Sequence, residues 1–72
     1  MTFVEKVRLL LRLNALIERK GTGCAEELAS RLNLSKASIY RYINVLRNLG
    51  AKIKYCPQKR SFIYEEEFDL IF

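Results

Sequence analysis

The sequence has no histidine and only two cysteines, Cys24 and Cys56, which lie far apart and form no CxxC pair. A structural zinc site takes about four ligands of the cysteine or histidine type, so no metal or other cofactor is expected. A disulfide requires the two thiols to meet in space and is disfavoured in a reducing cytosol. We therefore predict two free thiols.

Long hydrophobic runs are also missing. No segment approaches the roughly 18 apolar residues of a membrane helix. Glu5 lies where the unbroken apolar region of a signal peptide should begin. With 72 residues, the chain has room for a single domain over residues 1–72, which we expect to be cytoplasmic.

Catalytic groups are equally scarce. No nucleophile has a base nearby, and no glycine-rich phosphate loop occurs. The acidic pair Glu26–Glu27 suits the start of a helix, and the acidic residues 65–67 suit a solvated tail. The sequence therefore does not predict an enzyme.

Acidic residues are absent from residues 28–64, although the whole chain contains 8 of them. The basic residues of this stretch are Arg31, Lys36, Arg41, Arg47, Lys52, Lys54, Lys59 and Arg60. A long stretch with one sign of charge in a foldable sequence favours a surface that faces a polyanion. The alternative is a solvated basic face that keeps the protein soluble.

The first predicted helix covers residues 2–20. Thr2 and Glu5 have the spacing of a capping box, and Gly21 is expected to end the helix in the left-handed conformation. One apolar stripe consists of Phe3, Val7, Leu10, Leu13 or Asn14, and Ile17, with Val4, Leu9, Leu11 and Leu16 beside it. This exceeds what one core face needs and favours a partner contact. The alternative is that the C-terminal tail covers the excess.

Two further helices are predicted over residues 25–32 and 36–49, with a tight turn between them. Ser35 is a favourable N-cap for the third helix, and Gly50 is a favourable stop. The inward side of the third helix is predicted from its spacing to hold Ile39, Tyr42, Ile43, Leu46 and Leu49.

After the third helix the apolar pattern changes from helical to alternating. This predicts a β-hairpin over residues 51–64 with a basic tip, followed by a tail over residues 65–72. Three helices and a small antiparallel hairpin place the chain in the α+β class.

The segment from Leu28 to Gly50 resembles the winged helix-turn-helix of bacterial DeoR-type repressors and of the biotin-repressor N-terminal domain (HTH type 11). The family spacing is matched at Leu28, Ser35, Arg41, Leu46 and Gly50. With the following strand and wing, the resemblance covers residues 8–64. It implies a DNA-binding module of transcription regulators, either standing alone or forming part of a larger protein.

Two positions depart from the family pattern. Cys24 stands where the family usually has a serine or threonine before the second helix, and a thiol is a weaker acceptor, so a poorer cap is expected. The wing usually carries glycines near its tip, and residues 58–61 contain none.

The resemblance and the charge pattern together predict sequence-specific binding of double-stranded DNA. The third helix is expected in the major groove, and the basic wing on the DNA backbone. The predicted DNA-binding residues are Ser35, Lys36, Ala37, Ser38, Tyr40, Arg41, Asn44, Lys54, Lys59 and Arg60. Among them, Asn44 has the amide geometry that binds adenine, Arg41 suits guanine or phosphate, and Ala37 suits a thymine methyl group.

A homodimer through the first helix and the C-terminal tail is also expected, because such domains often pair two half-sites on DNA. The alternative function is a winged helix used for protein–protein contact, with DNA binding lost. RNA binding is a weaker third option, since no aromatic stacking platform is apparent from the sequence.

Overall fold

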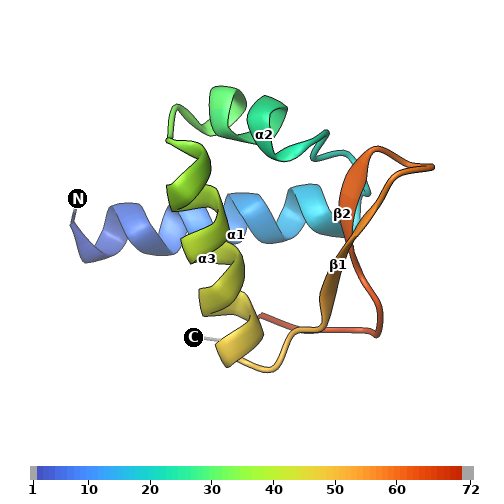
Figure 1. Ribbon diagram of the computed structural model, residues 1–72. Coiled ribbons are helices and arrows are strands. Elements are labelled where there is room, and N and C mark those ends of the chain that lie inside the picture. The colour runs from blue at the N-terminus through green and yellow to red at the C-terminus, as the bar shows by residue number, and fades with distance from the viewer. Residues whose placement is uncertain (1, 71–72) are drawn as a thin grey trace.

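A computed structural model describes residues 2–70 of the chain, which form three helices followed by two strands (Figure 1). The elements are α1 (Phe3–Glu18), α2 (Ala25–Leu32), α3 (Lys36–Asn48), β1 (Ile53–Cys56) and β2 (Ser61–Tyr64). The two strands pair as one antiparallel hairpin, whose tip projects away from the helices. This is the α+β winged helix-turn-helix layout that the sequence predicts.

Each helix is preceded by a residue suited to cap it. Thr2 Oγ1 accepts a backbone N–H of the first turn of α1 at 3.2 Å, and Ser35 Oγ does the same for α3 at 3.1 Å. Before α2, the backbone N–H of Cys24 donates to the Glu27 carboxylate over 3.5 Å. That bond is long and therefore weak, and it is one half of a capping box formed by Cys24 and Glu27 at the start of α2.

The end of α1 differs from the prediction. The helix ends at Glu18 instead of Lys20, and the left-handed residue is Lys20, at φ 56°, rather than Gly21. The N–H of Gly21 donates to the Leu16 carbonyl at 3.1 Å, which closes the last turn as in a Schellman motif. The chain leaves the helix early because Thr22 must reach β2, against which it is buried.

The other two helix ends follow the local sequence. Asn33 adopts the left-handed conformation after α2, at φ 55°, and so allows the tight turn into α3. Gly50 ends α3 at φ 110°, and the N–H of Ala51 donates back to the Leu46 carbonyl at 3.0 Å. The prediction that Gly50 stops the third helix is confirmed.

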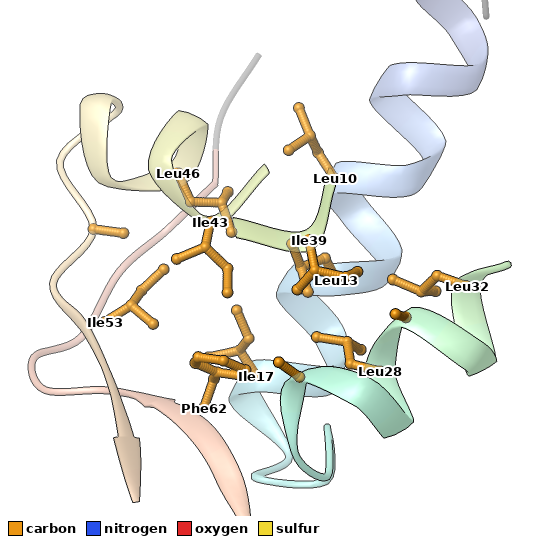
Figure 2. Packing of buried hydrophobic residues seen from close by; sticks show 13 residues of the cluster. Leu10, Leu13, Ile17, Leu28, Leu32, Ile39, Ile43, Leu46, Ile53 and Phe62 are labelled. Atoms are coloured by element: carbon orange, nitrogen blue, oxygen red, sulfur yellow. The ribbon is translucent and has the colours of Figure 1, made fainter. Parts of the chain in front are cut away.

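One hydrophobic core lies where the helices and the hairpin meet (Figure 2). Its buried residues are Leu10, Leu13, Ile17, Ala25, Leu28, Ala29, Leu32, Ile39, Ile43, Leu46, Ala51, Ile53 and Phe62. Four residues that the sequence places on inward stripes are not fully buried: Val7 and Tyr42 are half-buried, and Phe3 and Leu49 are exposed. Phe3 is 78% exposed because the first turns of α1 extend beyond α3, and Leu49 is 50% exposed at the C-cap of α3.

The C-terminal tail packs on the end of α1 within the same chain. The Tyr64 hydroxyl donates to Asn14 Oδ1, and the rings of Tyr64 and Phe68 lie 5.3 Å apart. Phe68 and Leu70 pack half-buried against the core. The described part of the tail thus covers one end of α1, while Ile71 and Phe72, which belong to the predicted dimer contact, lie outside the described residues.

Candidate functional site

The exposed side of α3 carries four polar or small side chains, three of which the sequence predicts to bind DNA. Ala37, Arg41, Asn44 and Asn48 are all exposed. At 100° per residue they lie within a narrow arc, opposite the side that enters the core. We call these four residues the outer face of α3. Asn48 was not among the predicted DNA-binding residues, although it shares their helical spacing.

Two other predicted residues, Lys36 and Tyr40, lie on the side of α3 that faces the hairpin. The ring of Tyr40 contacts the ring of Phe62 on β2 edge-on, with 6.4 Å between centroids. Tyr40 nevertheless remains 46% exposed. It therefore borders both the outer face of α3 and the space between α3 and the hairpin.

The N-terminus of α3 presents a pair of serine hydroxyls. Ser35 Oγ accepts the backbone N–H of Ser38 and donates its own hydrogen to Ser38 Oγ at 3.0 Å. The Ser38 side chain is partly exposed at this end of the helix. Since a helix N-terminus favours negative charge, this end of α3 suits an oxyanion.

Acidic residues at the start of α2 engage two of the predicted DNA-binding cations. Lys36 Nζ lies 3.4 Å from Glu26 Oε1, and the Arg60 guanidinium lies 3.0 Å from Glu27 Oε1. Hydrogen bonds from Cys24, assisted by the nearby Arg60 charge, hold the pKa of the Glu27 carboxyl below its usual value. Both ion pairs are solvent-exposed, so a stronger anion can replace either carboxylate at low cost.

The direction of Arg60 follows from the turn that precedes β2. The N–H of Arg60 donates to the Pro57 carbonyl at 3.2 Å, and Arg60 takes the left-handed conformation at φ 50°. The wing has no glycine to adopt this left-handed conformation, so Arg60 adopts it. The Arg60 side chain turns back toward Glu27 but stays 74% exposed, and Lys59 is exposed beside it at the tip.

Lys54 is separated from the residues of α3. The hairpin register pairs Lys54 with Ile63, and Tyr55 with Phe62. Since successive residues of a strand point to opposite faces, Lys54 lies on the face away from Tyr55 and α3. The structure therefore brings together the predicted residues of α3 but places Lys54 on the far side of the wing.

Arg47 joins the outer face of α3 to the hairpin, a role that was not predicted from the sequence. One guanidinium nitrogen donates to the Ile53 carbonyl of β1 at 2.9 Å, and the other donates to Asn44 Oδ1 at 3.3 Å. The i,i+3 spacing of Asn44 and Arg47 is the only local indication of this contact. The bond to Ile53 depends on how the hairpin folds back.

Other classes of site find no support in the described part of the chain. Across residues 2–70, no cluster of three or more metal-binding side chains is placed to hold an ion. Within the same range, none of the helices has the length and hydropathy to cross a membrane. Cys24 and Cys56 are both free thiols.

Comparison with known proteins identifies one family. A family model described as an HTH domain, HTH type 11, matches residues 8–59, which is well over half of the chain. The match spans α2, the turn and α3 and extends into the wing. No curated protein and no solved structure matches the chain.

Proposed function

The chain belongs to the HTH type 11 family, and we propose that it is the sequence-specific, double-stranded DNA-binding module of a transcriptional regulator. The family is one of DNA-binding domains of regulators. The observation that carries the finer proposal is the outer face of α3, an exposed strip with basic and amide side chains and no acid. In this proposal α3 enters the major groove, and α2 braces it against the DNA backbone.

Each residue of the proposed interface has a chemical role. Asn44 pairs with an adenine edge, Arg41 with guanine or a phosphate, and Ala37 with a thymine methyl group. Ser35 and Ser38 receive a phosphate at the N-terminus of α3. In these roles the outer face of α3 reads the bases, and the two serines at the N-terminus of the helix contact the backbone.

The remaining contacts are proposed to be phosphate contacts. Lys36 and Tyr40 flank the outer face of α3, and Lys59 and Arg60 lie at the tip of the wing. Lys36 and Arg60 exchange their exposed carboxylate partners for DNA phosphates. Lys54, on the far side of the hairpin, adds positive charge to the backbone contact at longer range.

A salt titration of binding to random-sequence duplex DNA tests this proposal. If about six cations meet phosphates, log K should fall against log salt with a slope of roughly −5, at about −0.9 per contact. A flat response, or no binding at low salt, would reject DNA binding. It would favour the second function, a winged helix that contacts another protein.

We also propose that the DNA-bound form is a homodimer through the exposed apolar residues of α1, together with the C-terminal tail. Phe3, Val4 and Leu11 of this helix are 78%, 59% and 46% exposed. Arg8, Arg12 and Glu18 could form a polar rim around a two-fold contact. Two half-sites about 34 Å apart on one side of the duplex would then be read together.

Sedimentation of the full chain at micromolar concentration tests the dimer. Leu11→Glu should convert a dimer to a monomer, because it places a charge in the apolar contact. Ser30→Glu introduces the same charge on the exposed side of α2 and should leave the dimer intact. A monomeric wild-type chain would reject the dimer and leave DNA binding to a single module.

A further inference from the structure

A cavity of about 500 Å³ lies between the start of α2, the hairpin side of α3 and the inner face of the wing. Its volume falls in the range of small-molecule sites. The side chains that line it include Cys24, Lys36, Tyr40, Arg47, Tyr55 and Phe62. The cavity is therefore bounded by α2, α3 and both strands of the hairpin.

The apolar part of this cavity consists of three aromatic rings. Phe62 is only 5% exposed and lies in the hydrophobic core. The ring of Tyr55 meets it at 5.3 Å and 72°, and the ring of Tyr40 at 6.4 Å and 83°. Tyr55 and Tyr40 remain 38% and 46% exposed. A flat ring can thus be received beside two partly open tyrosines, in edge-to-face or offset contact.

The polar part of the cavity is dominated by positive charge. Lys36 and Arg47 line it together with a single carboxylate, that of Glu26. The Lys36–Glu26 pair is exposed at both ends, with side chains 53% and 78% accessible, so an incoming anion can displace the carboxylate. The N-terminus of α2 at Ala25 adds a favourable dipole for an anion.

We propose that this cavity binds a planar aromatic anion, such as an aromatic carboxylate or sulfonate. The ring packs against Tyr40 and Tyr55, and the anionic group pairs with Lys36 and Arg47. This part of the proposal rests on the proposed DNA-binding function. The ligand competes with DNA, because Lys36 and Tyr40 contact both the ligand and the DNA. DNA binding by the wing and α3 would then be inhibited directly by a ligand bound between them.

The proposal can be tested with anilinonaphthalene sulfonate, an anionic aromatic dye, titrated into the full chain without DNA. Dye fluorescence should saturate at one site per chain. Tyr55→Ala should weaken binding up to about tenfold through the lost ring contact. Lys36→Gln should weaken it about two- to fivefold and Glu26→Gln should strengthen it by a similar factor, as expected for exposed charges.

A matched control separates this cavity from the other apolar surface. Phe3→Ala removes the most exposed aromatic ring of α1 and should leave dye affinity unchanged. Backbone amide shifts on adding dye should cluster at Ala25, Lys36 and Tyr55. Shifts along the first turns of α1, equal losses in Phe3→Ala, or a charge-independent affinity would overturn the proposal.

Competition with duplex DNA distinguishes the two proposals. Displacement of the dye by DNA is the expected result. Salt-sensitive DNA binding without a dye site would overturn the ligand proposal and leave the DNA-binding function standing. Charge-dependent dye binding that DNA does not displace would overturn the competition while retaining the site.

Discussion

The hydroxyl oxygens of Thr22 and Ser61 lie 3.1 Å apart in the interior, although 39 residues separate them. Ser61 Oγ accepts the backbone N–H of Thr22 at 3.1 Å, and Thr22 Oγ1 accepts the N–H of Phe62 at 2.9 Å. Both side chains are fully buried. The short segment between α1 and α2 is therefore attached to β2 through side-chain hydroxyls, and this attachment holds the wing against the helices.

Thr22→Val should destabilise the protein by about 1–3 kcal/mol, because the buried N–H of Phe62 loses its acceptor and the Gly23 carbonyl loses the Thr22 hydroxyl as a donor. Urea unfolding measures the effect. Thr22→Ser is the matched control, since it keeps the hydroxyl and removes only a methyl group. Equal losses in the two variants would show that packing of the methyl group, and not hydrogen bonding, accounts for the stabilisation by Thr22.

The two sides of α3 should respond differently to truncation. Ile43 has no exposed surface, so Ile43→Ala should cost about 2–5 kcal/mol of folding free energy. Arg41→Ala should leave stability nearly unchanged but weaken DNA binding. Asn44→Ala should relax base preference at one position by roughly 1–3 kcal/mol. Thermal melts and binding to a set of substituted duplexes measure both. An unchanged melting temperature in Ile43→Ala would contradict this assignment of faces.

Arg47→Lys separates the positioning role of this residue from its charge. Lysine keeps the positive charge but cannot donate to Ile53 and Asn44 in the fixed geometry of a guanidinium. The variant should lose about 1 kcal/mol of stability and some base discrimination at the position read by Asn44. The slope of log K against log salt should stay the same. A slope reduced by about one in Arg47→Gln, which removes the charge, would instead identify Arg47 as a phosphate contact.

Tyr64 should make stability fall at alkaline pH. Burial, with a smaller effect from the Glu18 carboxylate, raises the pKa of Tyr64 from 10.0 to about 12. Because the folded state holds this proton more tightly, its contribution is fully present below pH 10 and is lost as pH rises through about 12. In Tyr64→Phe, the decline in melting temperature across that window should be shallower. Equal declines in both proteins would contradict the assignment.

Much of the helical framework follows from local sequence. The caps at Thr2 and Ser35 and the stop at Gly50 lie where the sequence predicts them. These features depend on a side chain and backbone groups no more than a few positions away. The buried residues of α3, Ile39, Ile43 and Leu46, follow for the same reason, because a period of 3.6 is a property of the helix itself.

Local sequence predicted which side of α3 is exposed, but it did not predict the contacts that Arg47 and Arg60 make beside that side. Arg41 and Asn44 are exposed as their spacing requires. The bond from Arg47 to Ile53 and the ion pair from Arg60 to Glu27 exist only because the hairpin returns to the helices. No spacing rule predicts contacts between segments that are far apart in the sequence.

The sequence alone determined the element types, the order of helices and hairpin, and the polar side of α3, because propensity, capping and periodicity act over a few residues. Tertiary structure decided three other features. The helix α1 ends at Glu18, so that Thr22 is buried against β2. Phe3 lies beyond the core, and Phe68 and Leu70 pack against it. Each of these depends on where a distant segment packs. Their physical cause is burial and hydrogen bonding across the fold, which local pattern does not encode.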